Sequence, residues 1–142
     1  MQVPSEDHVI LEAAEDGRPK HVGWFRFFFD GERWEWSPEV ELMHGYQPGT
    51  ASPTTELVLS HKHPDDYQHV AATLDDVRRH HQAFSTRHRI IDTAGRIHHV
   101  IVVADKVADA GGAILGTHGL SVDVTPAEVY GEPVPEKALR VE

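Results

Sequence analysis

Histidine is the residue type in this sequence with the widest range of possible chemistry. Twelve of the 142 residues are histidines and none is a cysteine. The lack of cysteine excludes disulfides, thiolate nucleophiles, Cys-type zinc sites, covalent c-type haem and cysteinyl–flavin adducts. An unperturbed imidazole titrates near pH 6.5, and we interpret most of these histidines as solvated surface residues.

Two pairs of histidines lie close enough in the sequence to be considered as metal ligands. In an extended segment His61 and His63 point the same way and form a usable pair for Zn or Ni. His98 and His99 are adjacent, so on a strand they point to opposite faces and cannot chelate together. Because His63 directly precedes Pro64, a helix start is the preferred interpretation of that pair. We predict no native metal site.

Catalysis has little support in the sequence. Ser85, Asp92 and a histidine can be combined on paper as a triad, but no nucleophile elbow surrounds the serine. The glycines at positions 111, 112, 116 and 119 lack the strand–loop–helix context of a phosphate-binding loop. We therefore predict no catalytic residues and no enzymatic activity.

The second unusual feature is the stretch WFRFFFDGERWEWS at 24–37, which holds seven aromatic rings in fourteen positions. Asp30-Gly31 between two apolar runs predicts a β-hairpin with a type I′ turn, which needs positive φ at both central residues. The resulting register puts four rings on one face: Phe25, Phe27, Trp34 and Trp36. The opposite face is mixed and pairs Arg26 with Glu35.

The remaining elements follow from periodicity and capping residues. We expect strands near 23–29, 32–36, 84–91, 96–106 and 113–123. A short helix is predicted at Glu39–His44 after Ser37-Pro38, and a small one through Leu57–Leu59 capped by Thr54 or Thr55. The long helix is predicted near 64–80, opened by HPDD. Its inward face is formed by residues at helical spacing: Tyr67, Val70, Ala71, Leu74, Val77 and His81.

This order of elements predicts an α+β fold. The economical arrangement is a five-stranded antiparallel sheet with the helices packed on one face. The four rings of the hairpin then cover the space between sheet and helices. Residues 23–125 form the predicted domain, preceded by an extension at 1–22 with a short helix around Val9–Leu11. A proline-rich linker or tail follows at 126–142.

Charge and hydropathy limit the partners. The formal net charge of −10 repels phosphate backbones, so we expect no direct nucleic-acid binding. The longest apolar run, around Val100–Ala104, is far short of the ~20 residues that a membrane span needs. The N-terminus is acidic and lacks signal-peptide order. We therefore expect a cytoplasmic protein.

Four stretches together resemble a PAS domain: VGWFRFFFDGERWEWSPEVELMHGY, LSHKHPDD, FSTRHRIIDTAGRIHHV and ILGTHGLSVDVT. They span residues 22–125, and the last ends in the pattern GT-x-G-x-x-x-DVT. These motifs resemble in particular those of PAS domains in actinobacterial regulators that carry a C-terminal ANTAR domain. The ANTAR domain is an RNA-binding output that acts in transcription antitermination. PAS folds host many signals, so the resemblance implies a fold and a sensory role but no particular ligand.

The resemblance implies a sensor that relays to a C-terminal output. Seventeen residues follow Thr125, too few for a three-helix output. Either the output belongs to a longer chain or this is a stand-alone form, and the sequence does not decide. Relatives often carry Gly at the position of His81 and an aromatic residue near His99. We interpret His81 as a helix-capping residue, with haem ligation as the less favoured alternative.

Two functional hypotheses remain, and they are compatible; we favour a signalling role that uses both, in a homodimer. In the first, the space under the rings is a pocket for a small, largely apolar molecule. Non-covalent flavin stacked on Trp34 and Trp36 is a less favoured version. In the second, side chains fill the interior, and the domain serves dimerisation through the outer sheet face or the N-terminal segment, with Phe28 and alternate residues of 97–103 exposed. The candidate pocket lining, inferred from facing, is Phe25, Phe27, Trp34, Trp36, Met43, Leu57, Val70, Leu74 and Val77.

Overall fold

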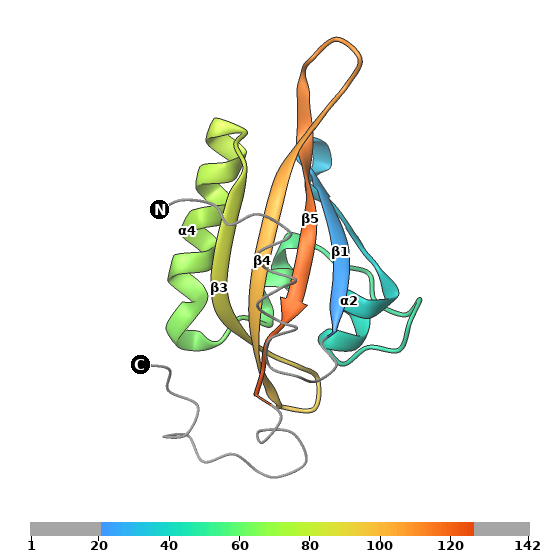
Figure 1. The fold of residues 1–142 in the computed structure, drawn as a ribbon, viewed down its shortest axis with the longest axis vertical. Helices are drawn as coiled ribbons and strands as arrows, with labels where there is room; N and C mark the ends of the chain where they lie inside the picture. The colour runs from blue at the N-terminus through green and yellow to red at the C-terminus, as the bar shows by residue number, and fades with distance from the viewer. Residues whose placement is uncertain (1–20, 127–142) are drawn as a thin grey trace.

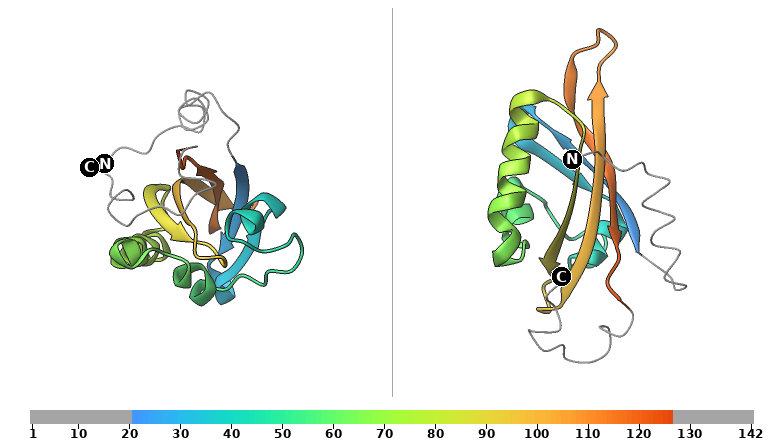
Figure 2. Two further views of the ribbon diagram at one scale, coloured as in Figure 1. Left: turned by 90° about the horizontal axis from the view of Figure 1, so that it is seen from below. Right: turned by 60° about the vertical axis from the view of Figure 1, so that its left-hand side comes forward.

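The computed structural model describes residues 21–126, and its centre is one antiparallel sheet (Figure 1). The strands are β1 (Val22–Phe28), β2 (Arg33–Trp36), β3 (Phe84–Ile91), β4 (Ile97–Ala108) and β5 (Ile114–Asp123), in the order β2-β1-β5-β4-β3. Three helices lie between β2 and β3: α2 (Pro38–Met43), α3 (Thr55–Ser60) and α4 (Pro64–His80). They pack on one side of the sheet (Figure 2), so the predicted α+β fold is confirmed.

Two of the predicted segments cannot be compared with this structure. The helix expected around Val9–Leu11 and the tail after residue 126 lie outside the described residues. Within residues 21–126, no helix is both long enough and apolar enough to cross a membrane.

The register of the first hairpin is the predicted one, but its turn is different. Phe25 pairs with Trp36 and Phe27 with Trp34. The chain turns through a short 3-10 segment, η1 (Asp30–Glu32), and the positive φ angles fall at Gly31 (72°) and Glu32 (49°) rather than at Asp30 and Gly31. The predicted type I′ turn is therefore wrong. Pairing stops one residue earlier than expected, at Phe28 and Arg33, and leaves a four-residue loop.

Side chains at the predicted positions cap the helices. Ser37 Oγ accepts hydrogen bonds from the backbone N–H of Val40 (3.3 Å) and of Trp24 (3.0 Å), so it caps α2 and also ties that helix to β1. Thr54 caps α3, and the ring of His63 caps α4 directly before Pro64. Each helix therefore starts where local chemistry predicts it.

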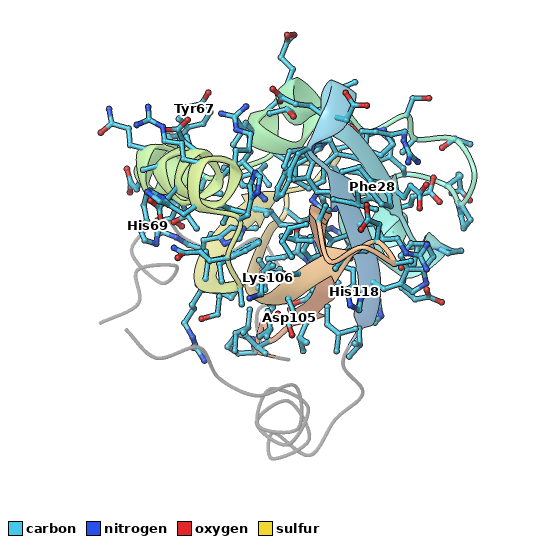
Figure 3. The ribbon with its side chains drawn as sticks, turned by 90° about the horizontal axis from the view of Figure 1, so that it is seen from above. Phe28, Tyr67, His69, Asp105, Lys106 and His118 are labelled. Atoms are coloured by element: carbon cyan, nitrogen blue, oxygen red, sulfur yellow. The ribbon has the colours of Figure 1, made fainter. Side chains whose placement is uncertain are left out.

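The inward face of α4 is narrower than the sequence pattern suggested. Val70, Leu74 and Val77 are buried, whereas Tyr67 in the first turn is 43% exposed and points to solvent (Figure 3). His81 is exposed as well, because its left-handed backbone (φ 49°) ends the helix and turns the chain aside. The prediction that Tyr67 and His81 share the inward face is wrong.

Two glycines in β5 explain the spacing of the GT-x-G pattern. A Cβ at Gly116 would collide with the carbonyl oxygen of Phe27 in β1, and a Cβ at Gly119 would collide with that of Val103 in β4. β5 lies between these two strands at the centre of the sheet. A residue without a side chain is needed wherever neighbouring backbone approaches this closely.

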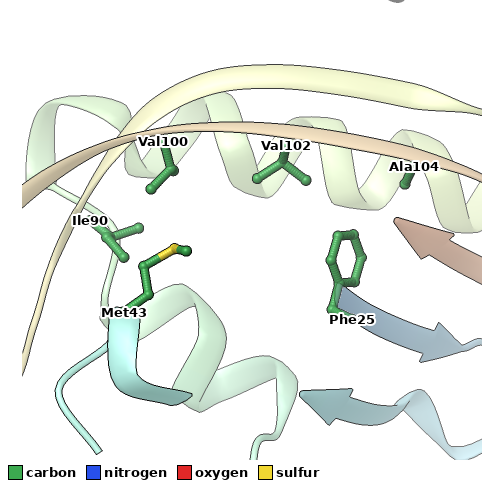
Figure 4. Close-up of a cluster of buried hydrophobic side chains, with 6 residues drawn as sticks. All are labelled: Phe25, Met43, Ile90, Val100, Val102 and Ala104. Carbon is green, nitrogen blue, oxygen red and sulfur yellow. The ribbon is translucent and has the colours of Figure 1, made fainter. Parts of the chain in front are cut away.

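The principal core lies between the sheet and the helices. Its buried cluster joins β1, α2, β3 and β4 (Figure 4): Phe25, Met43, Ile90, Val100, Val102 and Ala104. Trp34, Trp36 and Phe84 are partly buried and pack against this cluster. The hairpin rings therefore face the helices, as the sequence predicted.

The opposite face of the sheet holds a second apolar cluster of Ile101, Val103 and Val122, all of them buried. The expected exposed patch of Phe28 with alternate residues of 97–103 is therefore wrong. The guanidinium of Arg33 lies 4.2 Å from the centre of the Phe28 ring and covers it. Trp24, on β1, is the large apolar residue that this face exposes, at 40%.

Candidate functional site

A cavity of about 70 Å³ lies between the inner face of the sheet and helices α2, α3 and α4. All five strands contribute to its lining, together with the segment that joins α3 to α4. The lining residues are Phe25, Trp34, Trp36, Val40, His44, Val58, Leu59, Lys62, Val70, Thr73, Leu74, Phe84, Thr86, His88, Val102 and Ser121. One water needs roughly 10–15 Å³ by this measure, so the space suits a few waters or one small molecule.

Two tryptophans from the hairpin form one wall of the cavity. The Trp34 ring stacks on Phe27 with 4.3 Å between centroids, and its Nε1–H donates to Thr55 Oγ1 at 2.9 Å. The Trp36 ring stacks on His44 with 4.3 Å between centroids. Stacking and the hydrogen bond to α3 fix both rings in place.

A lysine brings a positive charge to this apolar space. Nζ of Lys62 lies 3.2 Å from Nε2 of His88, whose Nδ1 lies 2.8 Å from Thr86 Oγ1. Burial lowers the pKa of Lys62 to about 8, so its amino group remains mostly protonated at neutral pH. Burial, and then the charge of Lys62, lower the pKa of His88 well below 6.5. His88 is therefore neutral.

His44 presents a buried ring nitrogen without a partner. It is 5% exposed, its Nδ1 lies 2.8 Å from the carbonyl oxygen of Val40, and its Nε2 has no hydrogen-bond partner. Burial first, and the charge of Lys62 second, lower the pKa of His44 to about 3. The ring is neutral, and because Nδ1 must carry the proton that Val40 accepts, Nε2 offers a free lone pair.

Five of the nine residues expected to line a pocket border the cavity: Phe25, Trp34, Trp36, Val70 and Leu74. The other four do not. Phe27, Met43 and Val77 are each 1% exposed and belong to the packed interior, and Leu57 lies partly exposed on α3. The inward direction of a side chain, inferred from periodicity, does not show whether that side chain borders a cavity or fills the core beside it.

The polar residues that line the cavity were not predicted from the sequence. His44 and Lys62 each follow a short helix, and His88 lies between two arginines on β3, on the same face of the strand as Thr86 and Ile90. The period-two alternation of Thr86, His88 and Ile90 in the sequence is the signal that could have found His88, because a histidine at an inward position of a strand needs a partner. Nothing local indicates that Lys62 meets it.

His81 does not border the cavity, and this corrects the haem-ligand alternative. Its ring stacks on Phe29 with 4.4 Å between centroids, at the hairpin turn. Pockets for larger ligands have volumes of roughly 300–1,000 Å³, so neither haem nor flavin fits the space present here.

His61 and His63, the pair considered above as metal ligands, are engaged in other contacts. His61 Nδ1 lies 2.6 Å from the carbonyl oxygen of Ile91, and its Nε2 lies 2.8 Å from the hydroxyl of Tyr46. His63 accepts a hydrogen bond from the backbone of Asp65. Among residues 21–126, no group of three or more His, Cys, Asp or Glu side chains is placed to hold a metal ion.

A second polar cluster lies where β4 begins and β5 ends. His98 Nδ1 lies 2.7 Å from Asp123 Oδ2, and its Nε2 lies 2.8 Å from Asp92 Oδ2. Burial alone would lower the pKa of His98, but the hydrogen bonds to these two carboxylates raise it above 6.5. Asp123 Oδ1 also accepts from Thr125 Oγ1 at 2.6 Å. The Asp-Val-Thr end of β5 is therefore held by charge-assisted hydrogen bonds.

Comparison with known sequences identifies one family. The sequence model of the PAS fold matches residues 33–120, well over half of the chain. An uncharacterized protein of Mycobacterium leprae (strain TN) is 46% identical over 82 residues, which are 56% of this chain and 60% of that protein. The match thus spans less than two thirds of the relative.

Solved structures with the same fold come from several signalling proteins. The N-terminal domain of a diguanylate cyclase with PAS/PAC sensor from Marinobacter aquaeolei superposes with a TM-score of 0.65 at 17% identity, covering 73% of this chain and 95% of that domain. A sensory box histidine kinase/response regulator from Burkholderia thailandensis gives 0.59 at 21% identity, covering 81% and 84%. An RNA-binding light-oxygen-voltage receptor gives 0.63 at 20% identity, covering 82% of this chain and 32% of the receptor. At these identities the likeness concerns the fold.

Proposed function

Since this chain belongs to the PAS fold family, we propose that it is a sensory domain that binds a small molecule in its interior cavity and relays the binding to an output. The observation that carries the proposal is the hollow beneath Phe25, Trp34 and Trp36, because a core packed for stability alone leaves few voids larger than a water. Its neighbours in the fold include a diguanylate cyclase sensor and a histidine kinase. PAS domains typically act as sensory modules rather than as enzymes.

Strand β5 is the proposed route from the cavity to the end of the domain. Ser121 borders the cavity, and Asp123 lies two residues further along the same face of the strand. Asp123 is bound by His98 and Thr125. A ligand that displaces Ser121 would therefore shift the Asp-Val-Thr segment, where the chain leaves the sheet.

A second set of hydrogen bonds supports the same relay. The carbonyl oxygen of His44 accepts from the backbone N–H of Thr93 at 3.0 Å, in the turn between β3 and β4. Asp92, the preceding residue, contacts His98 at 2.8 Å. His44 at the cavity and Thr125 at the end of β5 are thus linked through one continuous network. Such a network transmits a signal only if ligand binding favours one of two arrangements.

The output and the assembly are further parts of the proposal. We propose an RNA-binding output of the ANTAR type, supported by the motif resemblance and by the RNA-binding receptor among the structural neighbours. We also propose a homodimer through the outer sheet face or the N-terminal segment, supported on that face by the 40% exposure of Trp24. The cytoplasmic location stays a prediction.

A ligand-free interaction module is the second candidate function. The exposed Trp24 favours it, since a tryptophan is often the anchor of a protein interface. In that case the cavity would be a packing defect, and the outer face alone would carry the function.

Native mass spectrometry of freshly purified protein, before and after denaturation, tests the proposal. We expect two subunits and an added small-molecule mass that is lost on denaturation. A monomer or dimer with the mass of the polypeptide alone, unchanged after incubation with cell extract, would contradict ligand sensing and favour the interaction module.

A further inference from the structure

The position of Lys62 is unusual for a lysine. Its backbone forms an isolated bridge with Ile90 at the edge of β3, which fixes where the side chain starts. From there Nζ reaches His88 inside the domain, at 3.2 Å. Lys62 is partly buried. A lysine that loses much of its hydration is uncommon unless an anion pairs with it, because transferring an ammonium ion out of water is costly.

No anion of the described chain pairs with this ammonium. Lys62 forms no ion pair within residues 21–126. Both carboxylate oxygens of Asp66, in the first turn of α4, are engaged by Arg89, with Nε–Oδ2 at 3.0 Å and Nη2–Oδ1 at 2.9 Å. The positive charge of Lys62 therefore faces a cavity with neutral, largely apolar walls.

The hydrogen bonds around Lys62 leave two of its protons free. With His88 Nδ1–H donating to Thr86 Oγ1, Nε2 of the same ring accepts one proton of the Lys62 ammonium. An ammonium group has three protons, so two remain for another acceptor. A carboxylate is the acceptor best matched to them in both charge and number of lone pairs.

The second polar feature of the cavity has the opposite character. His44 Nε2 is an acceptor, buried and without a partner, whereas Lys62 Nζ is a donor. An unsatisfied buried acceptor destabilises the protein unless a ligand or a water supplies a donor. The complementary molecule thus carries both a negatively charged acceptor and a neutral donor.

We infer that the cavity binds a small monocarboxylic acid with a hydroxyl group, its carboxylate on Lys62 Nζ and its hydroxyl donating to His44 Nε2. The inference rests on the proposed ligand-sensing function and specifies its chemical class. One ammonium neutralises one negative charge, so dianions are disfavoured. The volume of about 70 Å³ and the apolar side chains of Phe25, Leu74 and Val102 select a short aliphatic body.

Titrations followed by ¹⁵N–¹H NMR test the inference with three matched probes. Sodium lactate has both groups, sodium propionate lacks the hydroxyl, and 1,2-propanediol replaces the carboxylate with an alcohol. At constant ionic strength we expect lactate to shift the indole signals of Trp34 and Trp36 and the amide signals of Val70 and Leu74. Propionate should bind several-fold more weakly than lactate, and the diol at least tenfold more weakly.

Two variants assign the groups, and a third is the control. Lys62→Met should weaken lactate binding at least tenfold, while Lys106→Met, at an exposed lysine of β4, should leave it unchanged. His44→Phe keeps an aromatic ring beside Trp36 but removes the acceptor, so lactate and propionate should then bind equally. Dispersed NMR spectra and a cooperative unfolding transition confirm that each variant is folded.

The outcomes separate this inference from the proposed function. If the diol shifts the cavity signals as strongly as lactate, or if Lys62→Met binds lactate as the wild type does, the acid class is wrong while a ligand cavity stands. If none of the three probes reaches the cavity signals, the inference is overturned as well. The native mass measurement then decides independently whether the cavity holds any ligand.

Discussion

The ring of His98 lies against the carboxylate of Asp123, with 2.7 Å between Nδ1 and Oδ2. The other ring nitrogen faces Asp92 at 2.8 Å, so both nitrogens donate and the ring is an imidazolium. His98 and Asp123 are 8% and 2% exposed. This buried arrangement joins the β3–β4 turn, the start of β4 and the end of β5 where the chain leaves the domain.

The two shifted pKa values of the cluster predict the pH window in which its contribution to stability is largest. The folded-state pKa of His98 is raised, so its stabilisation is complete below 6.5 and is lost as pH rises through that higher value. Burial would raise the pKa of Asp123, but the hydrogen bonds from His98 and Thr125 lower it to about 2. Its stabilisation is present above 3.8 and is lost as pH falls towards 2. The contribution of this cluster to stability should therefore be complete only between pH 3.8 and 6.5.

His98→Gln tests this window by urea unfolding between pH 5 and 9. Because removing one partner leaves buried charges uncompensated, we expect a loss of about 3–5 kcal/mol at pH 6, and the loss should shrink as pH rises through the raised pKa of His98. His118→Gln, at an exposed histidine of β5, should cost less than ~0.5 kcal/mol. A difference between His98→Gln and wild type that is constant with pH would refute the charged state of this ring.

Trp34→Ala and Phe27→Ala separate the cavity wall from the packed core. Phe27 is 1% exposed and does not border the cavity, so its truncation should cost about 3–5 kcal/mol. Trp34 borders the cavity and is only partly buried, so Trp34→Ala should cost less and should abolish the lactate response. Urea unfolding measures the first effect and NMR titration the second. Equal costs with an intact lactate response would show that Trp34 is ordinary core.

His81 tests the left-handed end of α4. Glycine and alanine both remove its stacking on Phe29, but only glycine adopts positive φ without steric cost. We expect His81→Gly to be more stable than His81→Ala by about 1 kcal/mol in thermal unfolding. An alanine variant as stable as the glycine variant would mean that the helix ends with a different backbone conformation.

Lys62→Met tests the cost of placing a partly buried ammonium group beside the cavity in the ligand-free protein. Burial lowers the pKa of Lys62 to about 8 from 10.5, so the unfolded chain binds more protons between these values and wild-type stability rises with pH there. At pH 7 the variant should be more stable by roughly 2–3 kcal/mol, and the advantage should shrink by pH 10. A variant less stable than wild type at pH 7 would contradict the unpaired ammonium.

The strand register and the helix starts could be predicted because they depend on residues that are close together in the sequence. The pairing of Phe27 with Trp34 and the caps at Ser37 and Thr54 depend on residues within a few positions of one another. The turn type was not predictable in the same way. Glu32 takes positive φ while its carboxylate reaches Arg78 of α4 at 2.8 Å, a contact that lies outside any hairpin rule.

The functional centre depended on contacts between distant segments. Lys62 and His88 are 26 residues apart and meet only because α3 ends against the edge of β3. The same limit applies to His98, which the sequence paired with nothing and which the fold places between Asp92 and Asp123. Periodicity predicts which residues face inward, but not which inward side chains leave a hollow between them.

Crystals of the protein soaked in sodium lactate test the central claim most directly, because electron density reports where a ligand lies. The account predicts density for the acid between the sheet and α4, with its carboxylate within hydrogen-bonding distance of Lys62 Nζ. An interior filled by the protein's own side chains, with lactate bound nowhere or only on the outer face beside Trp24, would contradict it.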